Sequence, residues 1–152
     1  MRIVLQRVER AAVRVGAEAV GSIGAGLLLL VGVGHGDDRL DLTGAARKIL
    51  DLRVFQDAEG KMNLSLRELQ GEVLAVSQFT LYGDTRKGRR PSYTHAAPPE
   101  VAEPVFNAFV EALQAEGARV AMGRFGAHMS VELVNDGPVT LVLELAPSDP
   151  EG

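Results

Sequence analysis

The chain contains no cysteine and no tryptophan among its 152 residues, and aromatic residues make up only 5% of it. Without cysteine the protein has no disulfide, no thiolate nucleophile and no thiolate metal ligand. Its three histidines, His35, His95 and His128, are far apart in the sequence. None has a partner at the spacing of a metal-binding motif, and no serine–histidine–aspartate relay is evident. We therefore expect neither a metal nor another cofactor.

The sequence also lacks a long hydrophobic run, because the longest, at 27–31, is far too short to cross a bilayer. No charged segment with a following cleavage site opens the chain, so we expect a cytoplasmic protein with no membrane partner. The formal net charge of −4 argues against general affinity for nucleic acid but allows a local basic patch. The length predicts a single domain, expected over 1–145. Residues 146–152 are rich in proline and acid, and we expect them to form a loose tail.

The hydrophobic pattern alternates between short strands and two helices, which predicts an α/β fold. Strands are expected over residues 2–8, 13–15, 19–23, 27–33, 54–55, 73–76, 118–122, 131–133 and 139–143. One helix is predicted over about 37–53, capped by its first two aspartates, and a second over 98–116. The last two strands are expected to pair with each other across 135–138, and residues 61–65 to be irregular.

Glycines recur at every second position near the end of the strand expected at 27–33, as Gly32, Gly34 and Gly36. Such a run is found either in loops that bind phosphate or where two backbone segments pack closely. The run lacks the further glycine and the helix start of a dinucleotide-binding motif. We therefore favour close packing at the end of a strand.

Polar side chains follow the apolar run at 73–76, at the point where a buried strand should end. They are Ser77, Gln78 and Thr80, and Phe79 lies between them. A rigid strand that presents polar groups at its end is a common way to build a site. Neither hydroxyl has a neighbouring base in the sequence, and a hydroxyl without a base is a weak nucleophile. An enzyme built on this stretch would act by positioning its substrate and through backbone amides.

A cluster of positive charge follows the same stretch, with four cations in the five positions 86–90. The cations are Arg86, Lys87, Arg89 and Arg90. Such a run is usually a solvated loop. Here it stands beside a candidate site on a chain that is otherwise acidic, so we favour the interpretation that it contacts a phosphate-bearing substrate.

The sequence Asn-Asp-Gly-Pro at 135–138 is first of all a turn signal. About 5–6% of X-Pro peptide bonds in folded proteins are cis. A cis bond between Gly137 and Pro138 would turn two carbonyl groups toward the same side, where they could bind an ammonium group. Spacing alone leaves both possibilities open.

The stretches 77–81 and 135–140 strongly resemble the D-aminoacyl-tRNA deacylase family, once called D-tyrosyl-tRNA deacylases. Segments 6–8, 57–63, 87–92 and 123–125 are similar to the same family, so that the resemblance covers about residues 1–145. It implies an α/β fold with a barrel-like mixed sheet and flanking helices. It also implies a homodimer, with active sites at the subunit boundary, that hydrolyses the ester between a D-amino acid and the 3′-terminal adenosine of tRNA without a metal.

The resemblance assigns roles to the two stretches. Gly137 and Pro138 correspond to a cis glycine–proline motif that enters the partner's pocket, holds the substrate's α-amino group and leaves no room for an L side chain. Glycine has no side chain, so mischarged glycyl-tRNA would also be a substrate. Ser77, Gln78, Phe79 and Thr80 correspond to pocket-lining residues. Thr80 has been regarded as a nucleophile, but we favour attack by water assisted by the ribose 2′-hydroxyl, because no base stands near Thr80.

Other residues take supporting roles by the same resemblance. Arg7 would steady the glycine–proline loop, and Phe125 and Met129 would contact the terminal adenosine. The four cations of 86–90 would contact tRNA. Tyr82 and Gly83 depart from the family pattern, in which small residues are common, and we expect them to alter only the rim of the site. Two alternative functions remain compatible with these residues: a non-catalytic RNA-binding module, and an esterase acting on small D-amino-acid esters.

Overall fold

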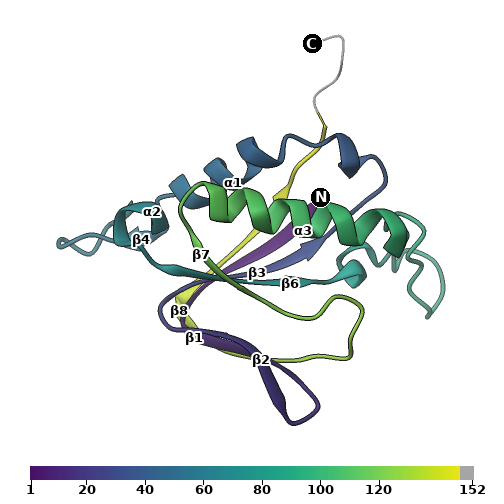
Figure 1. Cartoon of the computed structure of the whole chain (residues 1–152), viewed down its shortest axis with the longest axis horizontal. Coiled ribbons are helices and arrows are strands. Elements are labelled where there is room, and N and C mark those ends of the chain that lie inside the picture. The colour runs from purple at the N-terminus through teal and green to yellow at the C-terminus, as the bar shows by residue number, and fades with distance from the viewer. Residues whose placement is uncertain (148–152) are drawn as a thin grey trace.

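The computed structural model describes residues 1–147, which form a mixed sheet with two long helices on one of its faces (Figure 1). The strand order is β2-β1-β3-β6-β7, and β8 pairs with β1. The strands are β1 (Arg2–Val15), β2 (Glu18–Ile23), β3 (Gly26–Gly32), β6 (Glu72–Ser77), β7 (Arg119–Met122) and β8 (Ser130–Glu144). β3, β6 and β7 are parallel, whereas β1 is antiparallel to its three partners. From residue 148 onward the tail expected over 146–152 lies outside the described residues.

The long strand β1 organises the sheet. Its first half pairs with β3 and its second half with β2, while β8 follows its other edge almost throughout. The sheet curls until β2 meets β7. The two strands approach so closely that a Cβ on Gly21 would lie only 2.8 Å from the carbonyl oxygen of Met122. This near closure confirms the predicted barrel-like α/β fold. The sequence predicted separate strands at 2–8 and 13–15, but β1 runs continuously through both, with two register shifts in its pairing with β8.

The helices α1 (Leu42–Asp51) and α3 (Pro99–Ala115) cover one face of the sheet (Figure 1). Leu27 and Leu29 of β3 point into the core beneath these helices, where Phe106 and Phe109 of α3 are fully buried. Leu28 points into a second core on the opposite face. Burial on both faces explains why β3 is apolar at successive positions instead of alternating. Neither these helices nor any other within residues 1–147 is long and apolar enough to span a membrane.

The helix predicted over 37–53 is wrong at its start. A 3₁₀ turn covers Asp37–Arg39, and α1 begins only after Asp41, whose side chain accepts a hydrogen bond from the Gly44 amide at 3.0 Å. Asp37 is instead buried, with its carboxylate 2.7 Å from the amino group of Met1 and 2.7 Å from the Gly34 amide. The sequence signal for a cap was correct in type but belonged to the aspartate at position 41.

Two further predictions about strands are wrong, one because of long-range pairing and one because of a local hairpin. Residues 131–133 and 139–143 do not pair with each other, since both belong to β8 and both pair with β1. The segment expected to be irregular at 61–65 contains β5 (Met62–Leu64), which pairs with β4 (Phe55–Gln56). The short helix α2 (Leu66–Leu69) follows, and Ser65 and Glu68 form a reciprocal capping box at its start.

Gly32 and Gly34 at the end of β3 are packing residues, as the sequence indicated, whereas Gly36 has a φ of 85° and precedes the 3₁₀ turn. A Cβ on Gly34 would lie 2.7 Å from the Tyr82 hydroxyl, and a Cβ on Gly32 would lie 3.2 Å from the same ring. The ring of Tyr82 therefore fits against β3 only because these positions lack side chains.

Candidate functional site

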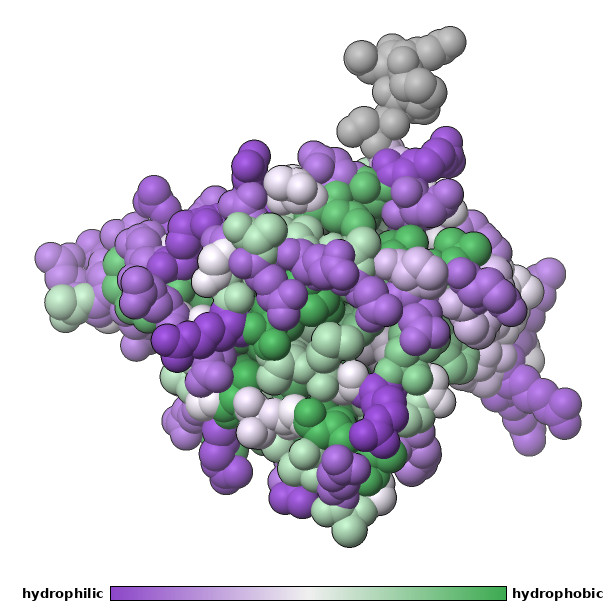
Figure 2. Space-filling model, in the orientation of Figure 1, coloured by the Kyte–Doolittle hydropathy of each residue, from purple (hydrophilic) through white to green (hydrophobic). Residues whose placement is uncertain are grey.

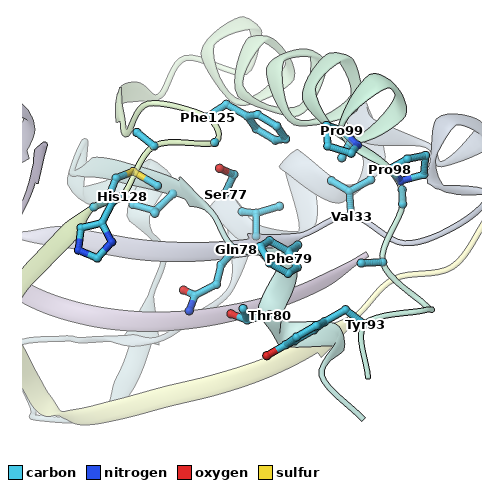
Figure 3. Close-up of a pocket in the computed structure, with 18 of the residues that line it drawn as sticks. Val33, Ser77, Gln78, Phe79, Thr80, Tyr93, Pro98, Pro99, Phe125 and His128 are labelled. Atoms are coloured by element: carbon cyan, nitrogen blue, oxygen red, sulfur yellow. The ribbon is translucent and has the colours of Figure 1, made fainter. Parts of the chain in front are cut away.

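A pocket of about 610 Å³ opens where the parallel strands β3 and β6 end. Val31 of β3 and Ser77 of β6 are neighbours in register, so the ends of the two strands lie side by side at its floor. Crevices at the carboxyl ends of parallel strands are frequent ligand sites. The lining residues labelled in Figure 3 are Val33, Ser77, Gln78, Phe79, Thr80, Tyr93, Pro98, Pro99, Phe125 and His128.

The polar stretch predicted to form a site lies in this pocket. β6 ends at Ser77, and the Gln78 amide donates a 2.8 Å hydrogen bond to the Val31 carbonyl. A 3₁₀ helix, Phe79–Tyr82, follows. The first N–H groups of a helix have no acceptor within that helix, so those of Phe79 and Thr80 are available to other oxygen atoms.

The hydroxyl groups of Ser77 and Thr80 have no activating base. In the part of the chain that the structure describes, neither makes a hydrogen bond to a histidine or a carboxylate within 3.5 Å, and the pocket is lined by no aspartate, glutamate, lysine or arginine. His128 lies on the wall but does not reach either hydroxyl (Figure 3). His128 was not predicted from the sequence as a site residue. The sequence signal that could have found it was its position between Phe125 and Met129, which were both predicted to contact the adenosine.

The deep part of the pocket is apolar. Phe125 and Met129, both expected to contact an adenosine, line it together with small aliphatic residues from β3 and from the start of α3. The Phe125 ring is partly buried and packs at 6.3 Å from the Phe106 ring of α3. A neutral apolar wall with a few polar groups at one end suits a flat, uncharged ring joined to a polar group.

The rim of the pocket carries two exposed aromatic rings, Phe79 and Tyr93, which contact each other edge to face. Tyr93 was not predicted from the sequence as a site residue. It follows the basic loop by three positions, and its aromatic side chain on an otherwise polar stretch was the available signal. The rim is therefore more apolar than the stretch 77–80 suggests.

The glycine–proline motif lies outside the pocket of its own chain. Gly137 and Pro138 are exposed on β8, and their peptide bond is cis. Arg7, which is buried, donates hydrogen bonds to the carbonyl oxygen of Asp136 at 3.2 Å and to that of Val54 at 2.6 Å. Its guanidinium also packs against Gly137 so closely that a Cβ there would collide with it.

Asn135 completes the support of this loop. Its side-chain amide donates to the carbonyl oxygens of Arg7 at 2.9 Å and of Val139 at 3.1 Å. These bonds span the point where the register between β1 and β8 shifts. The structure thus brings Arg7 and the motif together, as expected. Within one chain it does not bring the motif to the pocket of Ser77.

The four cations of 86–90 are exposed but are not equivalent. Arg86 pairs with Asp84 at 2.7 Å, and the hydrogen bonds from Arg86 lower the pKa of the Asp84 carboxyl to about 2. Within residues 1–147, Lys87, Arg89 and Arg90 have no carboxylate within 4.0 Å. Three uncompensated charges therefore remain on this loop. None of the four lines the pocket, and Arg86 faces a separate cavity of about 810 Å³ beside Tyr82.

No metal-binding group is evident in the described part of the chain, where no three histidine, aspartate or glutamate side chains converge.

Tyr82, one of the two residues that depart from the family pattern, does not line the pocket but lines the separate cavity beside Arg86. Its burial raises the pKa of its hydroxyl to about 12, and the Arg2 guanidinium stacks over its ring at 4.9 Å.

Comparisons with known proteins find similar sequences and structures over nearly the whole chain. A family model described as D-Tyr-tRNA(Tyr) deacylase matches residues 4–144. The chain is 56% identical over 144 residues to a D-aminoacyl-tRNA deacylase of Thermosipho africanus, covering 95% of this chain and 97% of that protein. A solved structure named c-Myc DNA Unwinding Element Binding Protein is 44% identical, with a TM-score of 0.88 over 97% of this chain and all of the other.

A second solved structure, titled as a probable eukaryotic D-amino acid tRNA deacylase, shares the fold at 19% identity. Its TM-score is 0.77 over 93% of this chain and 97% of that one. The family model and the bacterial relative both extend over nearly the whole chain and include both predicted site stretches. The chain belongs to the D-Tyr-tRNA(Tyr) deacylase family.

Proposed function

We propose that this protein hydrolyses the ester that joins a D-amino acid to the 3′-terminal adenosine of tRNA. One observation carries the proposal: the stretch 77–80 lines a pocket at the ends of β3 and β6, in a chain 56% identical to a protein named D-aminoacyl-tRNA deacylase. The apolar wall at Phe125 and Met129 receives the adenosine, and the ester lies at the polar end beside Thr80.

The hydrolysis needs no activated side chain. Water adds to the ester carbonyl, and the backbone N–H groups of Phe79 and Thr80 stabilise the negative oxygen that forms. The vicinal 2′-hydroxyl of the ribose orients this water. When the tetrahedral intermediate collapses, the adenosine 3′-oxygen leaves and takes up the proton that the water released. The pocket contributes by fixing the geometry of these groups.

Chiral selection is assigned to the motif of a second subunit. Gly137 and Pro138 are exposed and absent from their own pocket, so they are free to enter that of a partner. There their carbonyl groups hold the α-amino group of the substrate and occupy the space that an L side chain would need. Glycine presents no side chain to exclude, so the protein also hydrolyses mischarged glycyl-tRNA.

The sheet offers a surface for such a homodimer on the face that the helices leave open. Val4 of β1 lies between Leu30 of β3 and Val142 of β8, and these three form an apolar row. Val142 is 69% exposed in the single chain. The outer edge of β8 is also unpaired along the described chain, and exposed edges tend to recruit another chain. Because β8 carries the motif, a partner seated here would bring it to a second pocket.

The decisive experiment compares D- and L-tyrosyl-tRNA with the purified protein and follows loss of the ester. We expect rapid hydrolysis of the D ester and none of the L ester above the spontaneous rate. Glycyl-tRNA is expected to be hydrolysed as well. Equal rates for both stereoisomers would contradict selection by steric exclusion.

A non-catalytic nucleic-acid-binding module is the second candidate function. It is favoured by the uncompensated cations of 87–90 and by the 44% identical structure, which is named as a DNA unwinding element binding protein. Such a module would cleave neither tRNA ester. An esterase for small D-amino-acid esters would cleave D-tyrosine ethyl ester as fast as the tRNA ester, whereas the proposed enzyme requires the ribose.

A further inference from the structure

The rim of the pocket carries two aromatic side chains that ester hydrolysis does not use. The Phe79 side chain is 57% exposed and Tyr93 is 39% exposed. Their ring centroids lie 5.2 Å apart with an interplanar angle of 75°, and both line the opening beside Thr80 (Figure 3). On the face shown in Figure 2, hydrophilic residues surround a central apolar area. Exposed aromatic area at the edge of a binding pocket is therefore a candidate contact for more of the substrate.

The backbone around Tyr93 is fixed before any ligand arrives. Asp84 and Ser92 exchange two backbone hydrogen bonds, of 2.7 and 2.9 Å, that close the neck of the basic loop. The ring of Tyr93 packs over Gly83, where a Cβ would lie 3.2 Å from a ring carbon. A ligand that stacks on this ring does not have to order it first, which favours binding.

Positive charge lies next to the aromatic pair. The loop closed by Asp84 and Ser92 presents Lys87, Arg89 and Arg90, which have no carboxylate partner within the described residues. Proteins that bind single-stranded nucleic acid combine these two features, because bases stack on aromatic rings while phosphates lie beside cations. The combination favours a nucleotide over a protein surface as the occupant of the rim.

We propose that Phe79 and Tyr93 form a stacking platform for the nucleotide that precedes the terminal adenosine, which in tRNA is a cytidine. This inference rests on the proposed function, since it places the adenosine in the pocket. The enzyme then holds two nucleotides, one in the pocket and one on the rim. The phosphate chain continues past the cations of the basic loop.

The test compares two substrates that differ by one nucleotide: the D-tyrosyl ester of adenosine and that of the dinucleotide cytidylyl-adenosine. The wild-type enzyme should show a higher kcat/KM for the dinucleotide ester. Tyr93→Ala should lower that value by about 5- to 100-fold, mainly through KM, with a much smaller effect on the adenosine ester. Tyr93→Phe keeps the ring and should keep the ratio of the two values. Leu69→Ala, an exposed leucine of α2, is the control.

Equal kcat/KM values for the two esters, or a Tyr93→Ala variant that loses both equally, would overturn the platform. Calorimetric titration with unesterified dinucleotide and with adenosine supplies a readout independent of hydrolysis. If no D ester is hydrolysed, the proposed function has failed. The platform is then tested by binding alone: tighter binding of the dinucleotide than of adenosine supports it, and equal binding contradicts it. If Tyr93→Ala leaves the ratio of the two kcat/KM values unchanged but forms a smaller oligomer in light scattering, Tyr93 is a subunit contact and the proposal is wrong.

Discussion

At the scale of single residues, Arg7 shows how one buried cation can organise a functional loop. It is almost completely buried, yet it contacts Asp136, which is 129 positions away in the sequence. Its two hydrogen bonds go to the backbone carbonyl oxygens of Asp136 and Val54, and the Asp136 carboxylate lies 3.3 Å from the guanidinium. A buried charge is tolerated only when such partners satisfy it. Lysine could not replace it, because a single ammonium group lacks the planar fork that reaches two segments.

The isolation of the Thr80 hydroxyl leads to a prediction about catalysis. Because the structure places no base within hydrogen-bonding distance of it, we expect Thr80→Ala to retain substantial D-tyrosyl-tRNA hydrolysis, within about tenfold of the wild type. Single-turnover ester loss measures this directly. Abolished activity in both Thr80→Ala and His128→Gln, with circular dichroism unchanged, would instead favour a covalent mechanism with His128 as the base.

Tyr82 supplies a prediction about pH. Burial raises the pKa of its hydroxyl from 10.0 to about 12, so the folded protein holds this proton more tightly than the unfolded chain. The resulting stabilisation is fully present below pH 10 and is lost as the pH rises toward 12. In Tyr93→Phe, which leaves Tyr82 as the sole tyrosine, phenolate absorbance should therefore appear near pH 12. Titration near pH 10 in folded protein would contradict this.

At the scale of elements, the basic loop between β6 and α3 is where sequence and structure differ most usefully. All four cations were predicted to contact tRNA, but Asp84 at the closed neck of the loop pairs with Arg86. The elements on either side were predicted well, since β6 is a short continuous apolar run ended by polar residues and α3 has apolar residues at helical spacing. The pairing of one loop cation is a local geometric outcome that periodicity does not contain.

This difference gives a prediction for the loop. Changing Lys87, Arg89 and Arg90 to alanine should raise the KM for D-tyrosyl-tRNA severalfold and flatten its dependence on salt, because fewer counterions are released on binding. Arg86→Ala is the matched control and should have a smaller effect, since its charge is already compensated. Initial rates across a salt series measure both. No change in KM or in salt dependence for the triple variant would mean that the loop is ordinary solvated surface.

At the scale of the whole molecule, the proposed homodimer divides each site between two chains. Gly137 has a φ of 116° and no space for a Cβ beside Arg7, so Gly137→Ala should distort the motif. Ser77→Tyr should fill the pocket. Each variant alone is expected to be inactive. In a mixed dimer one site contains both changes and the other contains neither.

Mixing the two inactive variants in equal amounts, after dissociation and reassembly, should therefore restore about a quarter of the wild-type activity, because about half of the dimers are mixed. D-tyrosyl-tRNA hydrolysis measures the recovery, and each variant reassembled alone is the control. If activity stays absent although mass spectrometry detects mixed dimers, the motif acts on the pocket of its own chain or on none.

The sequence by itself determined the local features: the apolar strand at 73–76 with polar residues at its end, the doubly buried β3, the helix of α3, and two stretches specific enough to show a family resemblance. Each depends on neighbouring residues, whose periodicity or identity can be read directly. Tertiary structure decided the rest. It made one strand of residues 130–144, placed Tyr93 and His128 at the pocket, and set Arg7 against Gly137. These contacts depend on how distant segments pack, which no local pattern records.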